Sequence, residues 1–125
     1  MKNRFIALTA ICTLFFAACG NNPEKTVDNF YKATKDSDFG KAMTYTNVLP
    51  EERQQVIDVL SEMGMVIHEY KILGSTVDEG DTSATVKLHL VTSNAYNPNK
   101  IADDIDVPCI KSGSNWVVEL QPANN

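Results

Sequence analysis

The spacing of hydrophobic residues changes near residue 65 and divides the chain into two parts. From about residue 24 to residue 63, apolar residues recur every three or four positions, which is typical of helices with one buried face. From Val66 onward they alternate with polar residues, which is typical of half-buried strands. The pattern predicts an α+β fold, with about three N-terminal helices on one face of a curved, cone-like, four-stranded antiparallel sheet.

The expected helices cover residues 24–36, 39–45 and 50–63. The first has an apolar face, and Pro23 suits the position at which it begins. Asp38 is a good N-cap for the second helix, and Gly64 a good stop for the third. The third helix is expected to bury an apolar stripe made of Val56, Ile57, Leu60 and Met63.

The expected strands cover residues 66–77, 82–92, 103–111 and 115–121, with residues 93–102 as a loop. Alternation in the second and fourth strands points seven residues at the helices: Ala84, Val86, Leu88, Leu90, Trp116, Val118 and Leu120. Tyr70 and Ile72 should share that inner face. A plain two-residue turn would give the wrong pairing, so we expect an odd-length loop around Gly80 or a β-bulge near Gly74.

The first 18 residues have the layout of a secretory signal peptide. Lys2 and Arg4 precede an uncharged run, residues 5–18, which is shorter than the roughly 20 residues that a transmembrane helix needs. The following Phe16-Ala17-Ala18-Cys19-Gly20 resembles the lipobox of bacterial lipoproteins. The resemblance implies removal of residues 1–18 and attachment of lipid to Cys19. The alternative is ordinary cleavage that releases a soluble secreted product.

Lipid attached to Cys19 would make the membrane a binding partner of this protein. Residues 19–23 would form the lipid-anchored tether, and residues 24–125 a single domain. Neither an Asp directly after Cys19 nor an acidic run follows the cysteine. By resemblance to known sorting signals, we therefore expect a protein of the cell envelope on the periplasmic face of the outer membrane.

Charge narrows the range of partners further. The chain carries 11 basic and 16 acidic residues, a net charge of −5, and loss of Lys2 and Arg4 would leave −7. This sign disfavours nucleic acid, and it predicts repulsion from anionic headgroups. Cys109 would remain as the unmodified thiol. We expect it to be a small buried residue; the alternative is an exposed thiol that joins two subunits.

Four segments along the chain carry a resemblance to a known group of proteins: Val27-Asp28-Asn29-Phe30-Tyr31, Asp38-Phe39-Gly40-Lys41-Ala42-Met43, Ala84-Thr85-Val86-Lys87-Leu88 and Ile110-Lys111-Ser112-Gly113-Ser114-Asn115-Trp116-Val117-Val118. Their order resembles small bacterial lipoprotein domains of unknown function, related to lumazine-binding-like domains with the nuclear transport factor 2-like (cystatin-like cone) fold. The resemblance implies this fold and a lipid anchor, and it implies no characterised reaction.

No metal or cofactor site is expected. The expected register sends His68 and His89 to opposite faces of the sheet, so they cannot share an ion. The acidic segments at 78–81 and 103–106 lack the ligand spacing of a calcium loop and are expected to be solvated.

Five residues could converge on a pocket inside the cone: Asp28, Tyr31, Tyr45, His68 and Tyr70. The resembling fold includes ketosteroid isomerase-like and dehydratase-like enzymes, which use a buried carboxylate or an Asp/His pair. No pair of residues in this chain repeats that pattern. We therefore expect no catalytic residues and a module that binds a small apolar or aromatic molecule or a protein partner. The alternatives are a small hydro-lyase or isomerase, and an envelope interaction protein that forms a homodimer through Ile67, Val91 and Val117 on the outer sheet face.

Overall fold

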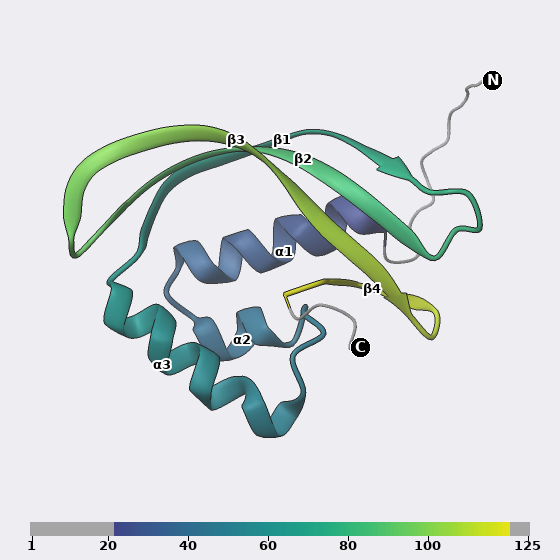
Figure 1. Cartoon of the computed structure of the whole chain (residues 1–125), viewed down its shortest axis with the longest axis horizontal. Coiled ribbons are helices and arrows are strands. Elements are labelled where there is room, and N and C mark those ends of the chain that lie inside the picture. The colour runs from purple at the N-terminus through teal and green to yellow at the C-terminus, as the bar shows by residue number, and fades with distance from the viewer. Residues whose placement is uncertain (1–21, 121–125) are drawn as a thin grey trace.

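The computed structural model describes residues 22–120, which form helices beneath a strongly bent sheet (Figure 1). The elements in chain order are α1 (Pro23–Lys35), α2 (Phe39–Met43), the 3-10 turn η2 (Pro50–Glu52), α3 (Arg53–Met63), β1 (Val66–Val77), β2 (Ser83–Asn94), β3 (Asn97–Ser112) and β4 (Asn115–Val118). The strands form one antiparallel sheet in the order β1-β2-β3-β4. The expected α+β architecture is confirmed.

α1 begins at Pro23, directly after its cap, Asn22. The side chain of Asn22 accepts a hydrogen bond from the backbone N–H of Lys25 at 2.8 Å, and Pro23 occupies the first turn, where its missing N–H costs nothing. The buried face of the helix includes Val27 and Phe30, which lie against the concave side of the sheet. α1 is therefore the main helix that covers the core.

α3 departs from the expected burial. It begins after Pro50 and ends at Gly64, whose φ of 61° is left-handed, as expected. Its apolar stripe, however, is only half covered: no residue of α3 is buried, Met63 is exposed, and Val59 is 55% exposed. The reason is that α3 packs mainly on α2 and η2 and has few contacts with the strands. An amphipathic pattern shows which face is apolar but not how much of it a neighbour covers.

The inner register of the sheet is as expected. Tyr70 pairs with Leu90 and Ile72 with Leu88, and a shift in pairing between Ile72 and Gly74 supplies the predicted bulge. A second shift, between Ile67 and Glu69, was not anticipated.

The prediction of a loop over residues 93–102 is wrong. β2 runs to Asn94 and β3 starts at Asn97, so Ala95 and Tyr96 alone form the turn. The side chain of Asn94 accepts hydrogen bonds from the backbone N–H groups of Tyr96 and Asn97, at 2.8 and 2.9 Å, and so closes the turn. The tip also touches α3, because the N–H of Ala95 donates to the carbonyl oxygen of Met63 at 2.9 Å.

The core lies between α1, α2 and one end of the sheet. Its buried residues are Val27, Phe30, Ala33, Ala42, Met43, Val48, Ala84, Val86, Leu88, Val107, Cys109, Trp116 and Val118. The hydroxyl of Thr26 donates to the carbonyl oxygen of Trp116 at 3.1 Å and joins α1 to β4. Leu120 lies beyond the end of β4 and is exposed, so its expected inward position is wrong.

Cys109 is a free thiol inside this core, and burial raises its pKa to about 11. Its position agrees with the expected small buried residue and contradicts an exposed thiol that joins subunits. The signal peptide and Cys19 lie outside the described residues. Within residues 22–120, no helix is both long and apolar enough to cross a membrane.

Candidate functional site

The inner face of the sheet changes from buried to exposed along β2 and β3. In antiparallel strands, residues directly opposite each other point to the same side. Val86 and Val107, which are paired, are buried, as is Leu88. Farther along the same face, exposure rises on β3 until Ile101, opposite Thr92, is 50% exposed, whereas Ile67 of β1, also opposite Thr92, is only 4% exposed. The helices therefore cover one end of the inner face and leave the β3 side of the other end open.

We call this second region the open end, and it consists of Leu90, Thr92, Ile101, Asp103 and Ile105. Leu90 and Ile105 are half-buried against the core, and Asp103 is exposed opposite Leu90. Figure 1 shows α3 below the arch that β2 and β3 form at this end of the molecule. Because Val56 and Leu60 of α3 are also half-buried on the edge of the core, the arch and α3 offer two incompletely covered apolar surfaces.

Three of the five expected pocket residues come together beside the open end. The hydroxyl of Tyr70 donates to the Asp28 carboxylate at 2.8 Å, and the ring centroids of Tyr31 and Tyr70 are 6.1 Å apart. Tyr70 is the cross-strand partner of Leu90, so this group borders the open end directly.

Both tyrosines are held in the neutral form at physiological pH. Burial raises the pKa of Tyr31 to about 12, with a smaller contribution from the nearby Cys109. The pKa of Tyr70 is also about 12, because of burial first and then its hydrogen bond to Asp28. The pair therefore offers aromatic surface and phenolic hydroxyl groups rather than a base.

The other two expected pocket residues lie elsewhere. Tyr45 lines a cleft of about 130 Å³ between α1 and α2, together with Lys32 and Lys41. The Nε2 atom of His68 is 2.8 Å from the hydroxyl oxygen of Ser93. His68 falls in the unanticipated bulge between Ile67 and Glu69, where simple alternation no longer gives the direction of a side chain.

Polar residues on the rest of the sheet form ordinary surface pairs. His89 contacts the carboxylate of Asp104 at 2.7 Å, and Lys87 contacts that of Asp106 at 3.1 Å. Among residues 22–120, no group of three or more His, Cys, Asp or Glu side chains is arranged to hold a metal ion.

The outer sheet face does not carry the apolar patch that the sequence suggested. Ile67 pairs with Thr92, so it lies on the inner face instead, where it is only 4% exposed, while Val91 and Val117 are half-buried. A groove of about 500 Å³ crosses β1, β2 and β3, and its lining includes the Lys87–Asp106 pair and Thr85. This groove is polar rather than apolar in its side chains, apart from Leu73.

The sequence reasoning missed Ile101 as part of the site because it was assigned to a loop, and it missed Asp103 because the acidic segment at 103–106 was expected to be solvated. A signal was present: Ile101, Asp103, Ile105, Val107 and Cys109 follow one another at every second position. Extending the alternation of the third strand backward would have placed all five on one face.

Comparison with solved structures defines the fold. No protein-family model and no curated protein matches the chain. An NTF2-like protein from Campylobacter jejuni superposes with a TM-score of 0.54 at 22% sequence identity, over 81% of this chain and 100% of that one. The chain has the NTF2-like fold.

Two further structures agree with this assignment. A SEC-C motif-containing protein from Rhodopseudomonas palustris has a TM-score of 0.59 at 20% identity, over 82% of this chain and 79% of that one. A ketosteroid isomerase-like protein from Erwinia carotovora has a TM-score of 0.54 at 14% identity, over 77% of this chain and 88% of that one. At these levels of sequence identity, the similarity to the three structures concerns the fold alone.

Proposed function

We propose that this protein is a lipid-anchored component of the cell envelope that binds a small apolar or aromatic molecule at the open end, without catalysing a reaction. The observation that carries the proposal is the loss of burial along the inner face, from Leu88 at the covered end to Ile101 at the open end. Apolar side chains exposed on a concave, rigid surface favour occupancy by an apolar ligand.

The residues around the open end indicate the chemistry of the ligand. Leu90, Ile101 and Ile105 offer aliphatic contact, and Tyr31 and Tyr70 add aromatic rings at the border. Asp103 stands on the same face as Leu90, at the exposed rim. A ligand with an apolar or aromatic body and a hydrogen-bond donor directed at Asp103 would match these groups.

The partners of the titratable groups support the proposal of binding without catalysis. The Asp28 carboxylate accepts the hydrogen bond of Tyr70, and His68 contacts Ser93 rather than a carboxylate. A general base needs a free acceptor in reach of the substrate proton. The geometry gives no specific support to an isomerase or hydro-lyase, and the burial of Ile67 removes one residue from the dimer surface that the sequence suggested.

Ligand binding can be tested with Nile red, a neutral aromatic dye whose emission rises in apolar sites. We expect the wild-type protein to increase the emission and Ile101→Ser to lower the affinity about fivefold, because the substitution removes aliphatic contact from the open end. Val77→Ser is the matched control, since Val77 is 45% exposed at the far end of β1. Equal losses in both variants, or no binding by the wild type, would contradict the proposal.

The natural ligand and the anchor have separate tests. Native mass spectrometry of protein purified from the envelope should show an additional bound mass that Ile101→Ser loses. Labelled palmitate should enter the wild type and be absent from Cys19→Ser. Incorporation into both chains, or into neither, would refute lipidation at Cys19 while leaving the dye experiment to decide on ligand binding.

A further inference from the structure

We propose that the exposed lysines of α1 and α2 form a membrane-facing surface that rests on anionic phospholipid headgroups. We call Lys25, Lys32, Lys35 and Lys41 the lysine face. This inference rests on the proposed lipid anchor at Cys19, and it goes further by stating how the folded domain is oriented on the bilayer.

The first reason is the length of the tether. α1 starts at Pro23, four residues after Cys19, and the cap at Asn22 fixes its first turn. Four residues of chain span at most about 14 Å. A domain attached so closely to a lipid-bearing residue cannot stand away from the headgroups, so one of its surfaces must lie against them.

The second reason is that charge is distributed unevenly over the fold. Residues 23–43, which contain α1 and α2, carry four lysines and four acidic residues, whereas the rest of the described chain carries five basic and 12 acidic residues. Three of these four acids have hydrogen-bond partners: Glu24 accepts from Ser75, Asp28 accepts from Tyr70, and Asp38 caps α2. The net negative charge of the protein therefore belongs to other surfaces.

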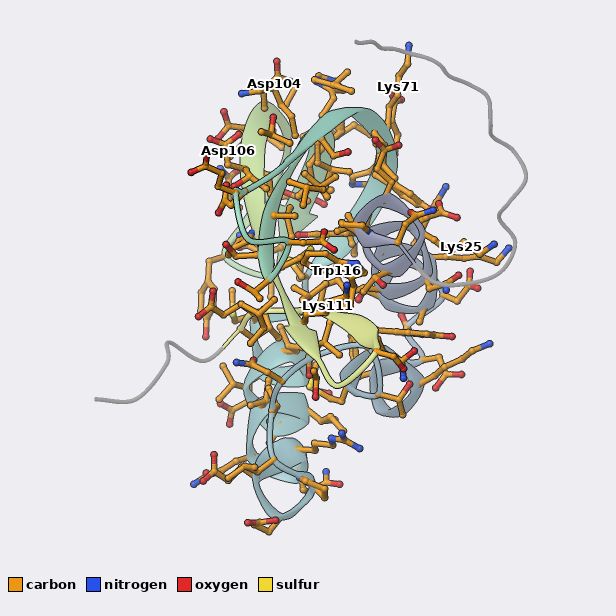
Figure 2. The ribbon with its side chains drawn as sticks, turned by 90° about the vertical axis from the view of Figure 1, so that its right-hand side faces the viewer. Lys25, Lys71, Asp104, Asp106, Lys111 and Trp116 are labelled. Carbon is orange, nitrogen blue, oxygen red and sulfur yellow. The ribbon has the colours of Figure 1, made fainter. Side chains whose placement is uncertain are left out.

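Two groups of acidic residues, at the β1–β2 turn and on β3, lie outside the lysine face. Figure 2 shows Lys25 on one side of the molecule and Asp104 and Asp106 on the opposite side. The turn between β1 and β2, with its acids at 78–81, lies at the same end of the molecule as the start of α1 (Figure 1). Contact through that end would press carboxylates against anionic headgroups, whereas contact through the flank of α1 avoids this repulsion.

Helix geometry places Lys25 and Lys32 on the same side of α1. Lys25 and Lys32 are seven residues apart, close to two helical turns, and so lie on one stripe of α1. Lys41 of α2 lines the same small cleft as Lys32, together with Asp36 and Asp38, so lysines of the two helices lie close to each other there. Flexible lysine side chains on such a flank suit a headgroup layer, which offers many phosphate groups in no fixed arrangement.

The test uses the lipidated protein reconstituted into vesicles of phosphatidylethanolamine and phosphatidylglycerol, with an amine-acetylating reagent and mass spectrometry as the readout. Flotation with the vesicles first reports the anchor. We then expect Lys25 and Lys32 to be acetylated about threefold or more slowly than in detergent, while Lys100 on β3 is unaffected. The protection should disappear at high salt and in phosphatidylcholine vesicles, because it depends on charge.

Charge reversal provides the matched variants. The double variant Lys25→Glu, Lys32→Glu should lose the protection of Lys35 and Lys41, whereas Lys100→Glu should keep it. Failure to float would overturn the anchor and this inference with it. Flotation with equal acetylation of Lys25 and Lys100 would overturn the orientation alone. Protection that persists in phosphatidylcholine, or protection by added protein without vesicles, would show a different occupant and also overturn it.

Discussion

The two ends of the inner sheet face use the same strands for different purposes. At the covered end, Leu88 and Val107 are buried in the core that α1 covers, and they contribute to stability. At the open end, the same alternation continues through Ile105 to Ile101, but α3 contacts the strands too little to cover it. The difference teaches that a continuous hydrophobic pattern on a strand reports direction, whereas the position of the nearest helix decides whether a residue supports the fold or remains accessible.

The largest expected contrast between the two ends is in the free energy of unfolding. Leu88→Ala should destabilise the protein by about 3 kcal/mol, because it removes fully buried methyl groups and leaves a cavity. Ile101→Ala should cost less than about 1 kcal/mol, since the side chain is half exposed. Urea denaturation followed by Trp116 fluorescence measures both, and equal costs would show that the open end is closed in solution.

Alkaline pH should affect the border between the two ends. Burial raises the pKa of Tyr31 from 10.0 to about 12, so the folded state keeps a proton that the unfolded state releases. Stability from this group is complete below pH 10 and is lost as pH rises to about 12, an effect on the order of 2 kcal/mol. Tyr31→Phe should reduce the fall in this window, while Tyr70, whose pKa is also raised to about 12, still contributes to it. Cys109, with a pKa raised from 9.0 to about 11, acts in the same direction from pH 9 and is unchanged in that variant.

The smallest effect should come from the hydrogen bond that borders the open end. Tyr70→Phe removes the donor to Asp28 while keeping the ring, so the free energy of unfolding should fall by about 0.5 kcal/mol in this half-buried position. Nile red affinity should change less than in Ile101→Ser. A larger loss of dye affinity in Tyr70→Phe would move the centre of the site from the aliphatic residues to the tyrosine.

Most of the fold could be predicted because its signals are local. The caps at Asp38 and Gly64 and the change to a period of two at Val66 each reflect backbone chemistry within a few residues. The bulge near Gly74 followed from requiring Tyr70 and Leu90 to share a face. These are constraints that a single chain states without reference to distant neighbours.

The site was harder to predict because it depends on side chains that no helix covers. The Asn94 side chain closes a turn where Pro98 and two asparagines suggested a loop, so Ile101 was not recognised as a strand residue. His68 lies in a bulge, where alternation no longer gives the direction of a side chain. No sequence pattern states how far α3 lies from the sheet, and that spacing creates the open end.

The contact between Ala95 and the end of α3 joins the tip of the β2–β3 hairpin to the helix below it. The N–H of Ala95 bonds to the Met63 carbonyl, and a Cβ atom added to Gly64 would come within 3.0 Å of the Ala95 Cβ atom. The tip of the β2–β3 hairpin and the end of α3 are thus joined directly, and we expect them to move together. A side chain at position 64 would therefore push the hairpin tip away from the end of α3.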